Sequence, residues 1–410
     1  MSGHDAQQFP YWRRNLKVLP ASNFLVSLGF AISWPFLPLM VRELGVHERL
    51  ETWVGYMALG FYVVSFVMNP IWGGIADHYG RKMMVLRASV GMGFPMMLVP
   101  FAQTPLAFAL LLMLIAVCNG STAAGMALLV ANTPPRRIGR ALAIAQTGSL
   151  IGQTMGPAAG AMLAGSITRP HWLFWASGAL LLVAGTLVAF FVQEVKRLAP
   201  GRWRLQWLGN LREIAVAPRV KPLFFLSFLF AMLWGGSVPI MSLYVLDLLQ
   251  GHPGAGGKEA MWIGAVALGL GISAVVAMPV WGRFLDRRDP ARVLAFAVTG
   301  AAVTQLPLLV LQTPLQLVLA RIAFGLGAAA MQPAIMRLLK DYAPRGMDAR
   351  AISYAASFQF VAMGLAPFSA GLMGPTLGLR AYFAFTITLT LVGLALWLRS
   401  GRVPKSESLS

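Results

Sequence analysis

The sequence has very little charge and almost no cysteine for its length. Charged residues make up 11% of the 410 residues and hydrophobic residues 57%, whereas about 25% of the residues in a typical soluble domain are charged. A soluble fold could not hide so much apolar surface from water. Cys118 is the single cysteine, which excludes a framework of disulfide bonds within the chain. The composition therefore excludes a soluble domain and a small disulfide-bonded one.

Motifs for catalysis, cofactors and metal ions are also missing. The five histidines do not have the spacing of zinc ligands, there is no nucleotide-binding P-loop, and no spacing supports a nucleophile with its base. Gly269 and Gly271 lie in an apolar run with no strand before them, so they do not form a dinucleotide-binding turn. We expect no enzyme activity, no cofactor and no metal site.

Acidic residues are scarce, since 14 Asp and Glu stand against 33 Lys and Arg, for a net charge of +19. A nucleic-acid-binding protein gathers its basic residues on one exposed face, but here most of them fall in alternate loops between apolar runs. This is the positive-inside pattern of cytoplasmic loops. The pattern predicts that the protein's partner is the lipid bilayer and not a nucleic acid. It also predicts that both termini lie in the cytoplasm. The first apolar run is too long for a signal peptide and lacks a cleavage site, so we interpret it as an uncleaved span.

Apolar runs long enough to cross a bilayer recur along nearly the whole chain. A hydrocarbon core about 30 Å thick needs about 20 apolar residues in a helix. The runs between charged, proline and glycine residues predict twelve transmembrane helices, at 17–41, 53–76, 83–102, 105–131, 141–166, 171–192, 221–248, 261–282, 291–311, 314–339, 350–373 and 380–399. The expected fold is therefore an all-α membrane protein.

The two halves of the sequence are related by an internal repeat. At an offset of 209 residues, the sequence Gln-Thr-Pro-Leu at Gln103 aligns with the same four residues at Gln312. Upstream the offset falls to 204, because of a glycine-rich insert around 251–257. Transporters built from two such repeats bind their substrate between the halves near mid-membrane. The predicted parts are an N-terminal six-helix half at 1–192, a cytoplasmic linker at 193–220 and a C-terminal six-helix half at 221–410.

A glycine-rich basic turn closes the second apolar run. It holds Gly73, Asp77, Gly80, Arg81 and Lys82, in the order glycine, three residues, aspartate, two residues, glycine-arginine-lysine. The pattern resembles the loop signature between the second and third spans of the major facilitator superfamily. The resemblance implies a latch that joins the two halves on the cytoplasmic side. In that latch Gly73 lets a helix approach closely, and the carboxylate accepts hydrogen bonds at a helix N-terminus. Simple loop charge is the alternative.

The second half carries a partial copy of this turn. Gly282 and Asp286 keep the spacing, but Asp289-Pro290 replaces the glycine-arginine pair. Only part of the latch can therefore be repeated there.

The fifth predicted span has small residues four apart. Gly152, Gly156 and Gly160 lie on one helix face, where a partner helix can approach, and Pro157 removes a backbone donor and permits a bend. The pattern is similar to the antiporter signature of the twelve-span drug/proton antiporters of the same superfamily. The resemblance covers the whole chain, is strongest to bacterial multidrug-resistance exporters, and implies a bend that closes one side of the cavity. Helix packing alone is the alternative.

Ionisable groups inside the membrane are candidates for coupling transport to protons. Arg321 lies roughly 12 Å along its helix from Thr313, and three roles stay open for it: tuning a nearby acid, binding an anionic substrate, or bonding backbone carbonyls. The superfamily's arginine of the fourth span is absent, and Leu112 stands in its place. No acid is expected at mid-depth. Glu43 and Asp247 are repeat-related at the outer ends of spans one and seven, which favours a structural or gating role over a proton site.

The candidate cavity walls carry amide and aromatic side chains, which suit bulky apolar compounds with few fixed polar demands. These residues are Asn23, Trp34, Asn119, Gln146, Gln153, Trp234, Gln332, Tyr354, Phe358 and Gln359. The sequence therefore predicts a monomeric secondary transporter of the bacterial inner membrane that exports small hydrophobic or amphipathic compounds, with the proton as coupling ion. A proton-coupled importer or metabolite permease of the same fold is the alternative, and a membrane sensor that transports nothing is a third possibility.

Overall fold

A computed structural model describes residues 9–134, 137–166, 169–194, 219–250, 257–343 and 348–400. Helices are the only regular secondary structure in these ranges. The chain divides into two compact units, residues 1–46 with 63–205 and residues 47–62 with 206–410. Helix α4 (Leu50–Tyr79) contributes its first part to the second unit and the rest, from Val63, to the first.

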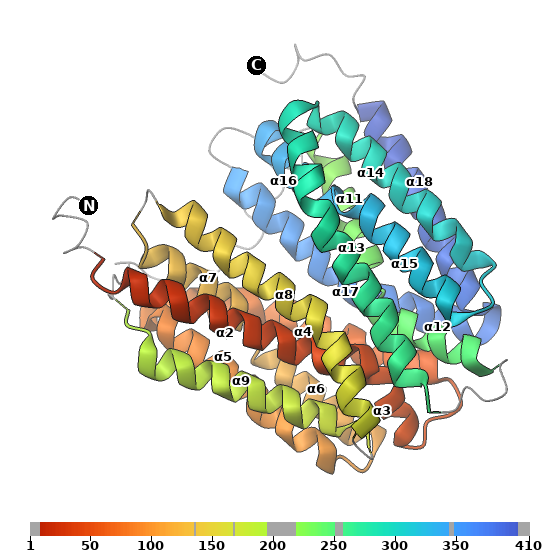
Figure 1. The fold of residues 1–410 in the computed structure, drawn as a ribbon, viewed down its shortest axis with the longest axis horizontal. Coiled ribbons are helices and arrows are strands. Elements are labelled where there is room, and N and C mark those ends of the chain that lie inside the picture. The colour runs from red at the N-terminus through yellow and green to blue at the C-terminus, as the bar shows by residue number, and fades with distance from the viewer. Residues whose placement is uncertain are drawn as a thin grey trace. The chain divides into compact units, whose positions relative to one another are not determined.

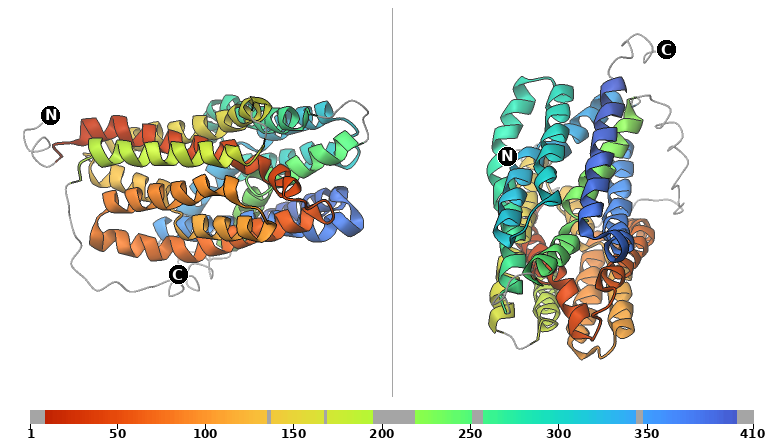
Figure 2. Two further views of the ribbon diagram at one scale, coloured as in Figure 1. Left: turned by 90° about the horizontal axis from the view of Figure 1, so that it is seen from below. Right: turned by 90° about the vertical axis from the view of Figure 1, so that its right-hand side faces the viewer.

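The first unit is a helix bundle in which α2 packs against α8 and α9. Figure 1 shows α2 between these two helices, and Figure 2 shows α2 and α9 side by side. Buried apolar residues such as Leu19, Val85, Leu128, Ala145 and Val188 form its core. Besides α4, its elements are α2 (Trp12–Ser33), η1 (Trp34–Phe36), α3 (Leu37–Glu43), α5 (Arg81–Leu98), η2 (Val99–Phe101), α6 (Pro105–Val117), α7 (Ser121–Ala131), α8 (Ile138–Ser166) and α9 (Trp172–Phe191).

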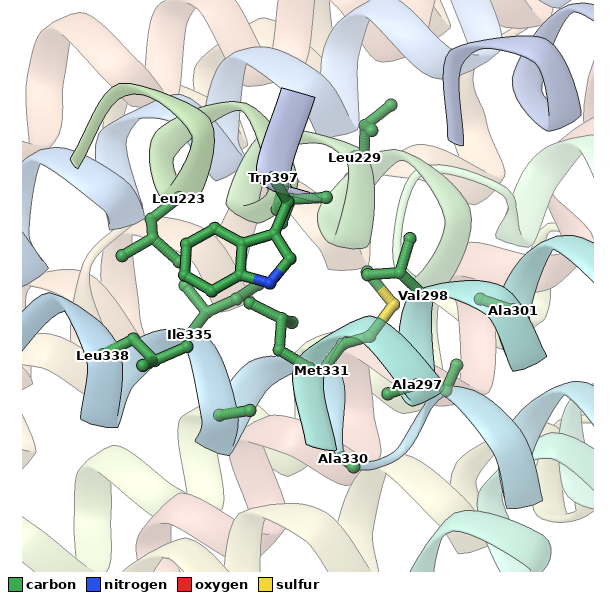
Figure 3. Close-up of a cluster of buried hydrophobic side chains, with 14 of the residues drawn as sticks. Leu223, Leu229, Ala297, Val298, Ala301, Ala330, Met331, Ile335, Leu338 and Trp397 are labelled. Carbon is green, nitrogen blue, oxygen red and sulfur yellow. The ribbon is translucent and has the colours of Figure 1, made fainter. Parts of the chain in front are cut away.

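The second unit has an apolar core that includes Trp397. Figure 3 shows the indole of Trp397 among side chains that include Leu223, Met331 and Ile335. Its Nε1 donates a hydrogen bond to the carbonyl of Ala291 at 3.3 Å. Besides α4, the elements are α11 (Val220–Trp234), α12 (Val238–Gln250), α13 (Glu259–Arg287), α14 (Pro290–Gln305), η4 (Leu306–Leu309), α15 (Pro314–Ala328), α16 (Met331–Tyr342), α17 (Asp348–Leu377) and α18 (Leu379–Ser400).

The internal repeat is visible in the helix ends. Helices α6 and α15 begin at Pro105 and Pro314, and a threonine precedes each. The hydroxyl oxygens of Thr104 and Thr313 accept hydrogen bonds from the backbone N–H three residues further on, at 3.2 and 3.4 Å. Such N-caps satisfy a donor that the first turn of a helix leaves free, so both repeats start this helix in the same way.

Helix occupies each of the twelve ranges predicted to cross the membrane. In the described part of the chain, ten helical segments are long and apolar enough to span a bilayer, and α6 is a shorter apolar helix. In four of the predicted spans one α-helix ends and another begins, which no sequence signal indicated: at 34–36, where a 3₁₀ turn joins α2 to α3, and at 118–120, 235–237 and 329–330. These are the first, fourth, seventh and tenth spans, so the breaks also follow the repeat. Backbone outside a helix is tolerated at membrane depth only where protein or water covers it, which makes the breaks candidate functional positions.

Candidate functional site

The turn between α4 and α5 is held by a network of hydrogen bonds inside the first unit. Gly80 has φ +95°, a conformation that favours glycine. The Glu194 carboxylate accepts hydrogen bonds from the backbone N–H groups of Arg81 and Lys82 at 2.9 and 3.0 Å, which caps the N-terminus of α5. The sequence analysis did not identify Glu194, because 112 residues separate it from Lys82.

The two cationic side chains of this turn donate hydrogen bonds to backbone carbonyls of neighbouring helices. The Arg81 guanidinium donates to the carbonyl of Ala127 in α7 at 2.9 Å, and the Lys82 ammonium donates to the carbonyl of Ala189 in α9 at 2.8 Å. Both carbonyls lie near helix C-termini, where positive charge is favourable. Asp77 lies within α4, but its side chain lies outside the part of the chain that the structure describes.

Gly73 and its repeat counterpart Gly282 both have open space beside them. A Cβ atom placed at Gly73 or at Gly282 meets no atom within 4 Å, so in this conformation neither position needs glycine for packing. Asp286, at the repeated turn, lies 3.7 Å from the guanidinium of Arg337, and both side chains are exposed.

Each of the two turns follows a tryptophan that makes the same contact in both repeats. Trp72 Nε1 donates to the carbonyl of Val117 at 2.6 Å, and Trp281 Nε1 donates to the carbonyl of Leu326 at 2.8 Å. Donor and acceptor are 45 residues apart in both cases. Val117 is the last residue of α6 and Leu326 lies in the last turn of α15, so each indole bonds a helix just before it breaks.

The glycine row of α8 packs against α2, as the spacing predicted. A Cβ atom at Gly152 would lie 2.6 Å from the carbonyl oxygen of Phe24, and one at Gly156 would overlap Ala31. A Cβ atom at Gly160 would overlap the carbonyl of Ile32. Pro157 lies within α8, which continues through it as a helix.

Arg321 is buried in the second unit, with 3% of its surface exposed. One guanidinium nitrogen donates to the Ser237 hydroxyl at 3.2 Å, and the guanidinium carbon lies 4.9 Å from the ring centre of Phe324. The ring of Phe324 lies 6.0 Å from that of Trp234, one of the cavity candidates. Ser237 lies at the break between α11 and α12.

Another arginine, Arg87, is partly buried in the first unit. Its guanidinium carbon is 3.6 Å from the ring centre of Trp72, and it donates to the carbonyl of Asn119 at 3.4 Å. Two of its nitrogens, Nε and Nη1, are buried with no hydrogen-bond partner. The repeat-related residue is Phe296, whose ring packs 5.7 Å from that of Trp281. The sequence analysis missed Arg87, although the 209-residue offset pairs this charge with an apolar residue.

The two repeat-related acids lie in different surroundings. Glu43 pairs with His171, whose Nδ1 lies 2.9 Å from a carboxylate oxygen, and Arg169 is close enough to act on it electrostatically. Asp247 is exposed on α12. The structure thus joins Glu43 to the start of α9.

Some cavity candidates come together in the second unit and others do not. Gln359 donates to Gln332 at 2.9 Å and to Ser227 at 2.8 Å, and Phe358 packs 5.3 Å from Phe224. The remaining candidates are placed singly. Asn119 donates to Ser65, Asn23 is buried beside Gly125, Trp34 is buried in η1, Tyr354 packs at the core of the second unit, and Gln146 and Gln153 are exposed on α8.

Secondary transporters are commonly built from two repeats that contain discontinuous helices. This fold has both features, so it belongs to that class of protein. The chain belongs to the Major Facilitator Superfamily, whose family model matches residues 21–268 and 223–410. Its substrate is therefore a small molecule and its surroundings a membrane.

The chain is similar over nearly its whole length to multidrug resistance proteins. It is 30% identical over 400 residues to the multidrug resistance protein MdtG of Escherichia coli O17:K52:H18, covering 96% of this chain and 97% of the relative. It is 31% identical to MdtG of Escherichia coli K12, with the same coverage.

Solved transporter structures share the fold. A bacterial homologue of the human lysosomal transporter Spinster, in an inward-facing and unoccupied conformation, matches with a TM-score of 0.77 at 13% identity, covering 96% of this chain and 97% of that one. The nucleoside transporter NupG matches with a TM-score of 0.78 at 13% identity, covering 95% and 99%.

Proposed function

We propose that this protein exports small hydrophobic or amphipathic compounds across the bacterial inner membrane in exchange for protons. The observation that carries the proposal is its identity of 30% to a multidrug resistance protein over 96% of the chain. Aromatic and amide side chains such as Trp234, Phe358 and Gln359 suit such compounds. The protein acts as a monomer with both termini in the cytoplasm, and the halves 1–192 and 221–410, joined by the linker 193–220, rock about a central cavity.

An importer or metabolite permease of the same fold is the second candidate, because the superfamily fold is shared by proteins such as the nucleoside transporter NupG. The two candidates differ in the sign of proton movement. In inverted membrane vesicles with an acidic lumen, adding an exported compound to the outside makes the lumen more alkaline under antiport, whereas a symported compound acidifies it.

The turn from Gly73 to Lys82 serves as the cytoplasmic latch, with Asp77 as its central charge. Replacing Asp77 with asparagine keeps the size of the side chain and removes the charge, so we expect drug export to be abolished. The measurement is drug accumulation, across a chemically varied panel, in cells that carry the wild type, Asp77→Asn or no transporter. Asp341→Asn, at an exposed position of α16, is the matched control. Equal membrane levels with normal export by Asp77→Asn would contradict the latch.

The Glu43–His171 pair is the candidate for proton binding in the first unit. Imidazole and carboxylate groups both bind protons, His171 Nδ1 lies 2.9 Å from a carboxylate oxygen of Glu43, and Arg169 adds positive potential beside the pair. We expect Glu43→Gln and His171→Gln to remove the drug-dependent alkalinisation of inverted vesicles while drug binding remains. If both variants move protons like the wild type, the pair has only a structural role, as the sequence analysis favoured for Glu43.

A further inference from the structure

Three polar side chains from separate elements are buried in the interior of the second unit. Arg321 comes from α15, Ser237 from the break between α11 and α12, and Tyr382 from α18. Their exposed fractions are 3%, 3% and 1%. The guanidinium bonds the Ser237 hydroxyl, and Tyr382 is close enough to interact electrostatically with Arg321. We call these three residues the Arg321 cluster.

The Arg321 cluster offers hydrogen-bond donors and has no anion of its own. Among the residues that the structure describes, no carboxylate pairs with Arg321. The Tyr382 hydroxyl is buried and finds no hydrogen-bond partner among the described residues. The Ser237 hydroxyl is already engaged, because it donates to the carbonyl of Leu233 at 2.7 Å. A buried charge without a counterion and a buried hydroxyl without a hydrogen-bond partner are both costly. A negatively charged acceptor would remove both costs.

Packing does not require these polar residues, because the other repeat fills the same positions with apolar ones. At the offset of 209, Arg321 corresponds to Leu112 and Tyr382 to Leu173. Both leucines are buried in the first unit, with exposed fractions of 1% and 0%. At the upstream offset of 204, Ser237 corresponds to Ser33, whose hydroxyl is buried with no partner. The serine is thus common to both repeats, while the arginine and the tyrosine belong to the second alone.

We propose that the Arg321 cluster is a binding site for a monovalent anion, either a halide ion or the carboxylate of an amphipathic compound. The anion accepts hydrogen bonds from the Arg321 guanidinium and from the Tyr382 hydroxyl, and it neutralises the buried charge. Ser237 orients the guanidinium by accepting a hydrogen bond from it. The site lies within the second unit alone and does not depend on which compounds the protein exports.

The test is thermal unfolding of the full-length protein, purified in a nonionic detergent, during titration with one of three probes. The probes are sodium bromide, sodium octanoate and octanol, which is the uncharged counterpart of octanoate. Specific binding raises the unfolding temperature in a saturable way. Because salt also acts nonspecifically, the quantity of interest is the difference between the wild type and each variant at the same concentration. A response to bromide identifies a halide site, and a response to octanoate but not to octanol identifies a carboxylate site.

Three variants separate binding from structure. Arg321→Leu copies Leu112 of the other repeat and is expected to remove the saturable rise. Tyr382→Phe removes only the unpartnered hydroxyl, so we expect a folded protein whose half-saturating concentration is about tenfold higher or more. Tyr244→Phe is the control, since its hydroxyl already donates to the carbonyl of Leu308 at 2.9 Å, and we expect it to keep the wild-type response. The proposal is overturned if neither anion gives a saturable rise, or if Arg321→Leu and Tyr382→Phe respond as the wild type does.

Discussion

Replacing Gly156 with leucine is expected to prevent the first unit from folding stably. A Cβ atom at this position would overlap Ala31 and lie 2.8 Å from its carbonyl carbon. Backbone atoms of α2 cannot rotate away as a long side chain can, so α8 and α2 must separate. Overpacking of a core usually costs about 1–3 kcal/mol and sometimes more, and here the neighbouring contacts at Gly152 and Gly160 would be lost as well. The measurements are the amount of protein in the membrane and its unfolding temperature after purification.

Gly165→Leu is the matched control, because it adds the same side chain to the same helix. A Cβ atom at Gly165 meets no atom within 4 Å. We expect this variant to reach the membrane and unfold at the temperature of the wild type. Equal stability of the two leucine variants would show that α8 and α2 do not pack through this glycine row.

Replacing Glu194 with alanine is expected to destabilise the start of α5 and to reduce drug export. The carboxylate accepts two backbone hydrogen bonds at the N-terminus of α5, and hydrogen bonds to a charged group contribute about 1.5–3 kcal/mol. Arg81 and Lys82 would then lose the backbone position from which they bond α7 and α9. The measurements are the free energy of unfolding of the purified protein and drug accumulation in cells.

Two further variants identify what the Glu194 carboxylate contributes. Glu194→Gln keeps one acceptor oxygen and loses the charge, so its loss of stability should lie between those of the wild type and Glu194→Ala. Glu48→Gln removes an exposed carboxylate and should change neither quantity. If Glu194→Ala unfolds and exports like the wild type, the cap does not hold the turn.

The sequence predicts the helices well because apolar runs and loop charge are local signals. The predicted range 350–373 lies inside α17, which runs from Asp348 to Leu377. The spacing of Gly152, Gly156 and Gly160 correctly predicted a close helix contact, although it could not tell that α2 is the partner. These features depend on residues a few positions apart along one helix.

The parts that the sequence did not reveal depend on contacts between distant residues. Glu194 reaches the start of α5 only after the chain has folded back from the end of α9, so no local pattern marks it as a cap. Arg87 lies close in the sequence to the basic residues Arg81 and Lys82, yet its guanidinium stacks on Trp72. The helix breaks at 118–120 and 235–237 contain glycine, but glycine is common throughout this chain and did not distinguish them.

The paired tryptophan contacts separate what the two repeats share from what each has alone. Trp72 and Trp281 bond repeat-related carbonyls in the two units, so this contact is part of the repeated unit itself. Arg87 and Arg321 correspond in the other repeat to the apolar residues Phe296 and Leu112. The indole bond is thus common to both units, whereas each of the two arginines belongs to one unit alone.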